Sequence, residues 1–515
     1  MRADEYPNYR CVTDYADSII SGRKTACKDL ILACLRFKSD LVNPEYDFNP
    51  KNAEFVILII ESTFCHQQGE KIDGTPLRGL PFLLEPFHKF IIYNLLGFVH
   101  KGTDNVRFHE ALIYIPRKNI KTSFAGALAW AFGLLYRMSG SKIYITAAAL
   151  PQALESFNFI KYNIERMNED DSFRIIDNNN EHSITAKIGE GFFFVRALAA
   201  NPDAQDSFNC NVAICDEIHA FKKPKQYNLF KEAMKAYTNK LMIGITTAGD
   251  NRNSFCYNRL LYCKKVLNGT VKDEQYFVFI CQADPEENGD IDYTNPVMHE
   301  MANPAYGVSI RPEEILNDSM QALNDPQQRK DFFAKSLNVY TSAMKAYFNI
   351  DEFIKSDRQY CWTISELCKM PIKWYGGSDL SKLHDLTAGA LVGLYKDILV
   401  IIPHCWFPIT AATKKSDEDN IPLFGWMDDG WLDMSNAPTV NHAEIVNWYV
   451  GLKKQGFKIK QVGHDRKFCR EYFVSMKKQG FKGNGRKSAT GKRHKKRFPA
   501  FKMEAFDDYI HTFGC

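Results

Sequence analysis

Residues 110–123 read Glu-Ala-Leu-Ile-Tyr-Ile-Pro-Arg-Lys-Asn-Ile-Lys-Thr-Ser, and this stretch decides the fold class of the first half of the chain. A short apolar run that ends at a proline is typical of a buried strand, and the uncharged run 123–136 has the length and composition of a helix. Between them, Lys121 and Thr122 stand where a phosphate-binding loop needs a lysine for the phosphates and a hydroxyl for Mg²⁺. Ile115 and Ile120 replace the two usual glycines, so a basic helix start is the alternative.

A second acidic motif strengthens the nucleotide-site interpretation. Residues 211–217 form an apolar run that ends in Asp216 and Glu217, and Asp216 stands 95 residues after Lys121. An acid at the end of such a strand holds Mg²⁺, and the next acid positions or deprotonates the attacking water. A strand that merely ends in acids is the alternative. Together, the two motifs predict an ATPase.

Strand-like and helix-like runs alternate through this region. The apolar runs 109–116, 141–149, 191–198, 211–217 and 240–248 are strand candidates, and 121–138 and 151–167 are helix candidates. This alternation predicts an α/β fold with a parallel sheet and flanking helices. The run 240–248 contains Thr246 and Thr247, which we expect near the γ-phosphate, although an ordinary strand-to-loop turn is possible.

The predicted domain organisation has two parts. Residues 1–350 form an ATPase domain with a helical N-terminal part, a nucleotide-binding core at about 80–260 and a helical region to about 350. Four β-rich runs, 373–380, 386–395, 398–407 and 457–465, then predict a second α/β domain over residues 351–515.

Composition excludes several protein classes. The 515 residues are 45% hydrophobic and 24% charged, which is typical of globular proteins. Fourteen cysteines without a CxxC pair argue against a zinc ribbon or a disulfide framework. The N-terminus has no signal-peptide core and the longest uncharged apolar run is too short for a bilayer, so we expect a soluble protein without membrane contact. Residues 477–497 hold ten Lys/Arg and no acid, which suits either polyanion binding or a solvated tail.

Three segments together, 116–123, 212–221 and 244–251, resemble the large terminase subunit of tailed bacteriophages, in particular its HK97-like branch. The resemblance runs from about residue 80 to 475. It implies a DNA-packaging motor in which a P-loop ATPase domain precedes an RNase H-like nuclease domain. In this family an arginine stands four residues before the loop lysine, as Arg117 does here, and is implied to neutralise charge in the transition state. His88 takes the place of an adenine-reading glutamine, although a surface histidine is the alternative.

The predicted ATP site therefore combines loop, acidic and coupling residues. Glu217, Arg117 and Lys121 carry the chemistry, and Thr122 and Asp216 hold Mg²⁺. The predicted nucleotide contacts are Arg117, Lys118, Asn119, Lys121, Thr122, Ser123, Asp216, His88, Thr246 and Thr247. The two threonines match the motif that is implied to pass the hydrolysis signal to DNA-gripping elements. Arg137 and Arg196 are among several arginines that qualify to act in trans.

The predicted nuclease site rests on scattered aspartates. Two-metal cleavage needs carboxylates that converge on ions about 3.5–4 Å apart. Asp379 and Asp465 each follow a strand-like run and match the terminase nuclease motifs, although such aspartates are usually turn formers. The third metal ligand is expected near the C-terminus, at Asp507 or Asp508, and Glu504 is a further candidate. Mg²⁺ or Mn²⁺ is the implied metal.

The resemblance also implies the biological setting. The chain is expected to translocate double-stranded viral DNA into a prohead with ATP and to cut concatemeric DNA. Its implied partners are the portal, a small terminase subunit and further copies in a ring, which is expected to be a pentamer. We expect it in the cytoplasm of the infected host, transiently docked on the prohead and absent from the mature virion. Two alternatives remain: a nucleic-acid-dependent ATPase without nuclease activity, or a defective prophage DNA-binding or assembly protein.

Overall fold

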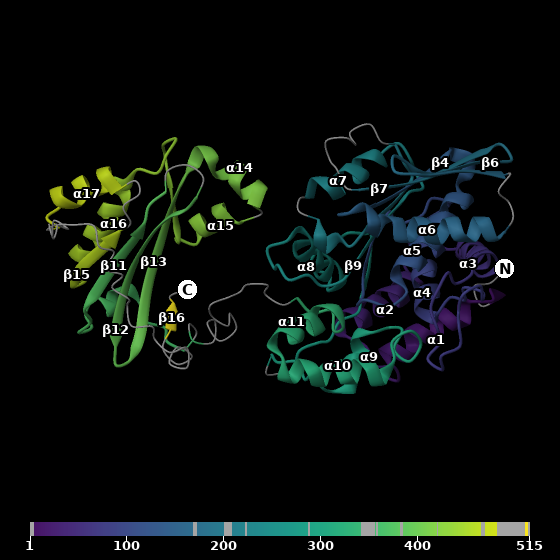
Figure 1. Ribbon diagram of the computed structural model, residues 1–515, viewed down its shortest axis with the longest axis horizontal. Helices are drawn as coiled ribbons and strands as arrows, with labels where there is room; N and C mark the ends of the chain where they lie inside the picture. Colours follow the sequence, from purple (N-terminus) through teal and green to yellow (C-terminus); the bar gives the residue numbers. More distant parts are fainter. Residues whose placement is uncertain are drawn as a thin grey trace. The chain divides into compact units, whose positions relative to one another are not determined.

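The computed structural model describes residues 5–167, 172–199, 209–221, 224–286, 289–340, 356, 359–381, 385–419, 421–464, 469–481 and 510–512. The chain divides into two compact units, Met1–Ala343 and Met344–Cys515 (Figure 1). Each unit has its own sheet and its own hydrophobic core, so each is described by itself.

The first unit is built on an eight-stranded sheet with the order β10-β3-β9-β8-β4-β7-β6-β5. The pairs from β10 to β7 are parallel, and β6 and β5 are antiparallel to their neighbours. Its strands are β3 (Glu110–Tyr114), β4 (Ser141–Ala147), β5 (Phe173–Asp177), β6 (His182–Ile188), β7 (Gly191–Ala199), β8 (Val212–Asp216), β9 (Leu241–Thr246) and β10 (Tyr276–Ile280). The predicted α/β class with a parallel sheet and flanking helices is confirmed.

Two features of this sheet differ from the prediction. Strand β10 pairs with β3, so the sheet continues beyond the predicted core limit of about residue 260. The hairpin of β5 and β6 extends the opposite edge. Residues Tyr276–Ile280 are all aromatic or β-branched, which is a strand signal that the prediction did not use.

Helices cover both faces of the sheet. Alternate strand residues point to opposite faces, and each face carries a separate hydrophobic cluster. One face packs mainly against α3–α6, and the other against α7, α8 and the short helix η5. These helices are α3 (Lys51–Thr63), α4 (Pro86–Gly97), α5 (Lys121–Leu135), α6 (Leu150–Arg166), α7 (Pro224–Ala233), α8 (Phe255–Leu267) and η5 (Ile218–Ala220). The result is a three-layer unit in which the parallel strands from β10 to β7 have their carboxyl-terminal ends at one edge.

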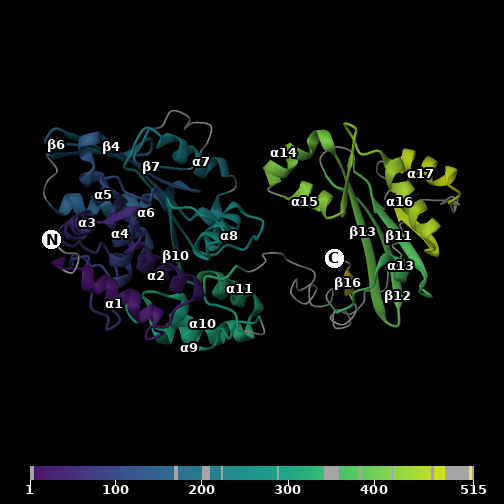
Figure 2. The same ribbon diagram turned by 180° about the vertical axis from the view of Figure 1, so that it is seen from behind.

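Two further groups of elements complete this unit. N-terminal helices α1 (Tyr9–Ile20) and α2 (Lys28–Asp40) pack against each other, and β1 (Tyr46–Phe48) pairs with β2 (Phe98–His100). A helical segment after β10 contains α9 (Pro296–Ala302), α10 (Pro312–Asn324) and α11 (Pro326–Lys335). Figures 1 and 2 show this segment gathered at one end of the unit.

The second unit contains a mixed sheet in which β14-β13-β12-β11-β15 is the strand order and β16 pairs with β13. Helices α13, α16 and α17 contribute to its main core, and α14 and α15 form a smaller cluster beside the end of β13. The strands are β11 (Trp374–Asp379), β12 (Thr387–Tyr395), β13 (Ile398–Pro408), β14 (Leu432–Ser435), β15 (Ile459–His464) and β16 (Ile510–Thr512). The helices are α13 (Ile364–Leu367), α14 (Ile409–Asp419), α15 (Leu423–Asp428), α16 (His442–Gln455) and α17 (Cys469–Lys478).

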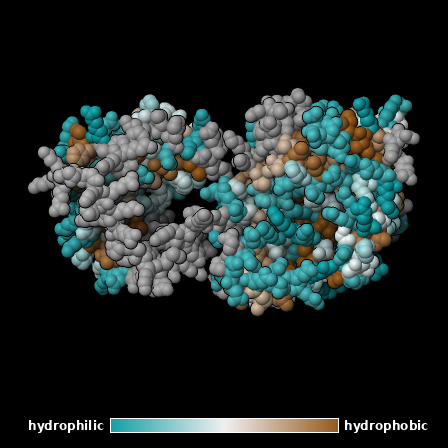
Figure 3. Space-filling model, in the orientation of Figure 1, coloured by the Kyte–Doolittle hydropathy of each residue, from teal (hydrophilic) through white to brown (hydrophobic). Residues whose placement is uncertain are grey.

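The surface is mostly polar. Figure 3 shows hydrophilic side chains over much of the visible face, with separate hydrophobic spots between them. Isolated apolar residues of this kind are normal on protein surfaces. None of the helices in the described part of the chain combines the length and the apolar character that a membrane crossing requires.

Candidate nucleotide and metal sites

The phosphate loop joins β3 to the N-terminus of α5. Two of its residues adopt the left-handed conformation, Lys118 with φ 66° and Ile120 with φ 61°. Ile120 stands where the usual pattern has a glycine and is the residue immediately before α5. A left-handed backbone costs a non-glycine residue about 1–2 kcal/mol, and β-branched residues adopt it least readily. The loop therefore keeps a glycine-like shape without the glycine.

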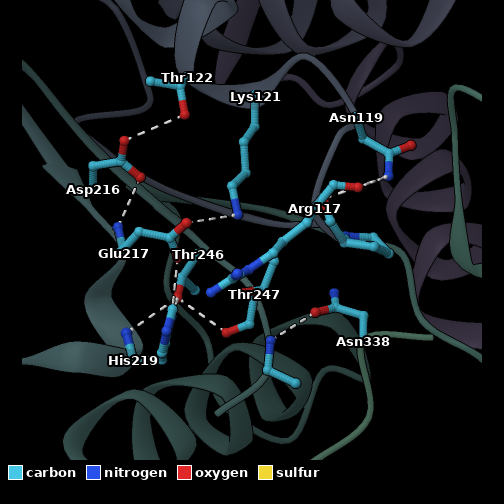
Figure 4. A network of polar contacts seen from close by, with 12 residues as sticks. Arg117, Asn119, Lys121, Thr122, Asp216, Glu217, His219, Thr246, Thr247 and Asn338 are labelled. Carbon is cyan, nitrogen blue, oxygen red and sulfur yellow. Dashed lines mark hydrogen bonds and ion pairs between the residues drawn. The ribbon is translucent and has the colours of Figure 1, made fainter. Parts of the chain in front are cut away.

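The structure brings the loop and the acidic motif together, as Figure 4 shows. Lys121 Nζ lies 3.3 Å from Glu217 Oε1, and Thr122 Oγ1 donates a hydrogen bond to Asp216 Oδ2 at 3.3 Å. Strands β3 and β8 end at the same sheet edge, with β9 between them. These contacts place the predicted phosphate-binding lysine and metal-binding hydroxyl directly beside the predicted acids.

Burial sets the electrostatics of this cluster. Burial raises the pKa of Asp216 to about 7, and the charge of Glu217 acts in the same direction. Burial also acts to raise the pKa of Glu217, but hydrogen bonding to His219 and the charge of Lys121 outweigh it and lower the pKa to about 2. Burial lowers the pKa of Lys121, against the opposing charges of Glu217 and Asp216. Glu217 is therefore the ionised partner that holds Lys121.

The oxygens present are those that Mg²⁺ prefers. A threonine hydroxyl and an aspartate carboxylate side by side are hard ligands, and Mg²⁺ sites commonly use one or two carboxylates plus substrate phosphates. A cation held by Thr122 and Asp216 would also offset the cost of burying the negative charge of Asp216. The residues present therefore fit the predicted metal, and Lys121 retains donor capacity for phosphate oxygens.

His219 is a member of the cluster that the sequence prediction missed. Its Nδ1 lies 3.0 Å from Glu217 Oε2 and 3.1 Å from Thr246 Oγ1, and its backbone N–H donates to Thr246 Oγ1 at 3.1 Å. Thr246 and Thr247 are both buried, as expected for residues at the end of a central strand. His219 thus connects the predicted catalytic acid with the predicted coupling threonine.

The remaining loop residues differ in their surroundings. Arg117 is exposed, and Figure 4 shows its side chain reaching toward the cluster. Its charge also contributes to lowering the pKa of Lys121. Lys118 is exposed, and Ser123 is half-buried in the first turn of α5. The Arg117 side chain therefore lies near Lys121, as its predicted role in the transition state requires.

The side chain of Asn119, which is predicted to be a nucleotide contact, is bound to other parts of the protein. Its side chain is fully buried and lies on the side of the loop away from Asp216 in Figure 4. The amide donates to Asn303 Oδ1 at 2.7 Å and accepts from the Ala305 N–H at 3.0 Å. Because both ends of the amide are bound to protein groups, this side chain braces the loop.

His88 is neither a surface residue nor an open adenine contact. The side chain is 1% exposed, and its ring stacks on Phe124 with the centroids 4.4 Å apart. Nδ1 accepts from the Glu85 N–H at 3.2 Å, which forms part of the cap of α4. Within the described residues, Nε2 has no hydrogen-bond partner. The alternative of a surface histidine is wrong, and in this structure the enclosed ring presents no open edge to a base.

The burial of His88 predicts acid sensitivity. Burial lowers its pKa to about 3, so the folded chain keeps this ring neutral while the unfolded chain protonates it near pH 6.5. Each pH unit below about 6.5 therefore costs about 1.4 kcal/mol of stability until the folded pKa is reached. Between pH 7.5 and 5.0, the wild type is expected to lose about 2 kcal/mol more than His88→Gln, whose amide keeps the capping acceptor.

Urea unfolding followed by circular dichroism at both pH values measures this difference. His100→Gln is the matched control, because His100 is partly exposed. Equal pH dependence in the wild type and His88→Gln would contradict the buried neutral histidine.

Asp379 ends β11 in the second unit and is exposed. Its neighbour Ser378 is buried, and the Ser378 hydroxyl lies 3.0 Å from Tyr449 OH and 2.9 Å from Tyr472 OH. Tyr449 OH also donates to Gly377 O at 2.7 Å. A Cβ at Gly376 would lie 2.8 Å from the Tyr449 ring, which explains the glycine. The strand end that carries Asp379 is therefore held by tyrosines of α16 and α17.

The other predicted nuclease ligands are outside the described residues: Asp465, Asp507, Asp508 and the further candidate Glu504. Strand β15 runs parallel to β11, and its last paired residue, His464, is opposite Ser378. His464 directly precedes Asp465 in the sequence, and Ser378 directly precedes Asp379. Within the part of the chain that the structure describes, no three histidine, cysteine, aspartate or glutamate side chains gather into a metal-binding group.

Comparisons with known proteins agree with both halves of the chain. The family model "Terminase large subunit, ATPase domain" matches residues 86–265, and "Terminase large subunit, endonuclease domain" matches residues 270–481. The second match begins within the first unit, to which β10 and α9–α11 belong. The two matches together span most of the chain.

Relatives have low sequence identity. Protein YmfN of Escherichia coli (strain K12) is 27% identical over 292 residues, which cover 51% of this chain and 61% of YmfN, so the match spans about three-fifths of that relative. The large terminase subunit of Enterobacteria phage HK97 is 25% identical over 402 residues, 76% of this chain and 73% of that protein. The crystal structure of the HK97 large terminase aligns over 83% of each chain, with a TM-score of 0.46 and 21% identity.

The two family matches cover the regions that hold the ATP-site cluster and Asp379. Lys121, Thr122, Asp216 and Glu217 lie together at one edge of the sheet, within the region that the ATPase-domain model matches. The chain therefore belongs to the terminase large subunit family, with an ATPase domain followed by an endonuclease domain.

Proposed function

We propose that this chain is the motor subunit that moves double-stranded viral DNA into a prohead with ATP and cuts concatemeric DNA. The observation that carries the proposal is the meeting of Lys121 and Thr122 with Glu217 and Asp216 at one sheet edge. DNA contact is proposed to be mainly with backbone phosphates, because a translocating motor cannot depend on base sequence. The proposed domain bounds are 1–350 for the ATPase and 351–515 for the nuclease.

Each residue of the ATP site is proposed to have a separate role in binding or hydrolysis. Lys121 exchanges its ion pair with Glu217 for the β- and γ-phosphates, which frees the Glu217 carboxylate to accept a proton from the attacking water. Thr122 and Asp216 would hold Mg²⁺, which neutralises phosphate charge when it is bound. Arg117 is proposed to stabilise transition-state charge, and Lys118 and Ser123 to contact phosphates.

The link from hydrolysis to movement is proposed to pass through Thr246 and Thr247. His219 supports this role, because one imidazole nitrogen lies within hydrogen-bond distance of both Glu217 and Thr246. A change in the charge or position of Glu217 would therefore reach β9 directly. Nucleotide binding through His88 would require its pocket to open.

In the second unit, Asp379 and Asp465 are proposed to hold Mg²⁺ or Mn²⁺ together with Asp507 or Asp508. The support is the parallel register of β11 and β15, in which Ser378 and His464 are paired. Carboxylates that follow these residues would suit metal-dependent phosphodiester cleavage. The tyrosine contacts of Ser378 would keep Asp379 in place.

The proposals for assembly and location rest on the resemblance to the terminase family. The proposed partners are the portal of the prohead, a small terminase subunit and other copies of this chain in a ring, with five as the proposed number. The proposed location is the cytoplasm of the infected bacterial host, with transient docking on the prohead and no place in the mature virion.

A DNA-stimulation assay tests the motor proposal. ATP turnover by the purified chain is expected to rise when double-stranded DNA is added, by the same factor for unrelated sequences and less at higher salt. Lys121→Ala is expected to abolish turnover with or without DNA. Lys101→Ala, at an exposed position in the turn after β2, serves as the matched control. ATP turnover that is indifferent to DNA would contradict a DNA-translocating motor.

A further inference from the structure

Three consecutive residues of the phosphate loop are hydrogen-bonded to the helical segment 295–340. The Arg117 N–H donates to Lys335 O at 3.1 Å, and Ser309 Oγ donates to Lys118 O at 2.7 Å. The third contact joins the side chains of Asn119 and Asn303 at 2.7 Å. The loop is thus attached to residues that lie about 180 to 220 positions later in the sequence.

The asparagine pair is buried and has its amide groups satisfied. Asn119 is 0% exposed and Asn303 is 2% exposed. Asn303 Nδ2 donates to His299 O and Ser336 O, both at 2.9 Å, so its Oδ1 faces Asn119. The backbone N–H of Ala305 fixes the other end of the Asn119 amide at 3.0 Å. These partners define the orientation of both amides.

The brace surrounds the strained part of the loop. Lys118 and Ile120 flank Asn119, and both have a left-handed backbone. Such conformations persist in non-glycine residues only where the surrounding structure over-determines them. A glycine at position 120 would hold this shape without help, because it adopts positive φ as readily as negative φ.

We infer that Asn303 is a positioning residue for the nucleotide site: through Asn119 it holds the phosphate loop in the left-handed shape that Ile120 disfavours. The inference rests on the proposed ATP site. If Asn303 has this role, the helical segment α9–α11 contributes to nucleotide binding by holding the loop in shape. No residue of that segment needs to touch the nucleotide.

The same segment also holds the turn that follows the coupling threonines. Asn338 is buried, its Oδ1 accepts from the Ala248 N–H at 2.8 Å, and its Nδ2 donates to Cys281 O at 2.7 Å. Figure 4 shows this contact below Arg117 and the side chain of Asn119 above it. The segment therefore contacts both the phosphate loop and the turn after Thr247, which keeps the two in a fixed relation.

The first test is nucleotide affinity in the full chain. The Kd for a fluorescent ATP analogue with Mg²⁺ is expected to rise about tenfold in Asn303→Ala, because the unbraced loop leaves its strained shape. Asn324→Ala is the matched control, since Asn324 is exposed on α10 of the same segment. Its Kd is expected to equal that of the wild type.

The second test is rescue at a position that Asn303 does not contact. In the Asn303→Ala background, Ile120→Gly is expected to bring the Kd back to within about threefold of the wild type, because glycine adopts positive φ freely. Ile120→Ala removes most of the same side chain but keeps a Cβ, so it is expected to leave the Kd raised. A merely structural defect at position 303 would respond equally to both changes.

Three outcomes would overturn the inference. They are an unchanged Kd in Asn303→Ala, equal responses to glycine and alanine at position 120, and no rescue by either. Should Asn303→Ala fail to fold, Ser309→Ala removes only the hydroxyl contact with Lys118 O, and the same glycine-versus-alanine comparison decides in that background. A wild type that binds no nucleotide, with Lys121→Ala indistinguishable from it, would instead overturn the ATP site itself.

Discussion

Glu217→Gln is expected to reduce ATP turnover by about 10³-fold, within the range that a positioned general base contributes. Glutamine keeps the size of the side chain and its contacts with His219 but cannot accept a proton from water. Nucleotide affinity is expected to be retained or increased, because the phosphates no longer compete with Glu217 for Lys121. Steady-state phosphate release and nucleotide titration measure the two quantities on one preparation.

The control for this change is Glu232→Gln. Glu232 pairs with Lys235 on the surface of the first unit, so the same chemical substitution is made away from the cluster. Its ATP turnover is expected to match that of the wild type. Near-normal turnover in Glu217→Gln would exclude Glu217 as the base, and loss of nucleotide binding would point to a structural role instead.

Asp379→Asn is expected to abolish plasmid nicking with Mn²⁺, with a loss of about 10³-fold or more, because a metal ion supplies several kcal/mol of transition-state stabilisation. Asparagine keeps the shape of the side chain but removes the charge that holds the ion. Asp379 is exposed at the end of β11, so the fold is expected to tolerate the change. Gel analysis of supercoiled plasmid, with metal concentration varied, gives the rate.

The matched control is Asp397→Asn in the turn between β12 and β13. Asp397 is exposed and has φ 67°, a conformation that asparagine adopts well. Its nicking rate is expected to equal that of the wild type. Wild-type nicking by Asp379→Asn would remove this residue from the metal site, whereas recovery at high Mn²⁺ would support weakened metal binding.

The sheet edge that holds the proposed ATP site was predictable because its elements carry strong local signals. Strands β3, β8 and β9 are mostly apolar and buried on both faces. Asp216 ends β8, and Lys121-Thr122 open the helix that follows β3. Parallel strands place their carboxyl ends at one edge, so residues distant in the sequence were expected to meet. The contacts of Lys121 with Glu217 and of Thr122 with Asp216 confirm that expectation.

What could not be predicted depends on neighbours rather than on pattern. His219 acquires its role because β9 lies between β3 and β8, which brings Thr246 beside it. Asn119 was expected at the nucleotide because of its place in the loop, yet a segment near residue 303 occupies its amide. His88 follows a helix start and looks exposed in sequence, but Phe124 covers it. No local signal identifies such partners.

The second unit was predicted through its strands alone. The runs that became β11, β12, β13 and β15 were recognised, and the pairing of Ser378 with His464 follows from their order in the sheet. The sequence around Gly376 and Gly377 did not indicate that Tyr449 contacts these two residues. The ring contact explains the glycine only once α16 is in place, since a helix 70 residues later supplies it.

A crossed assay tests the division into two sites most directly. ATP turnover, and plasmid nicking with Mn²⁺ in the absence of ATP, are measured side by side for the wild type, Glu217→Gln and Asp379→Asn, with folding checked by circular dichroism. The account predicts that Glu217→Gln loses only turnover and that Asp379→Asn loses only nicking. Loss of both activities in either folded variant, or an unaffected wild-type pattern in both, would contradict it.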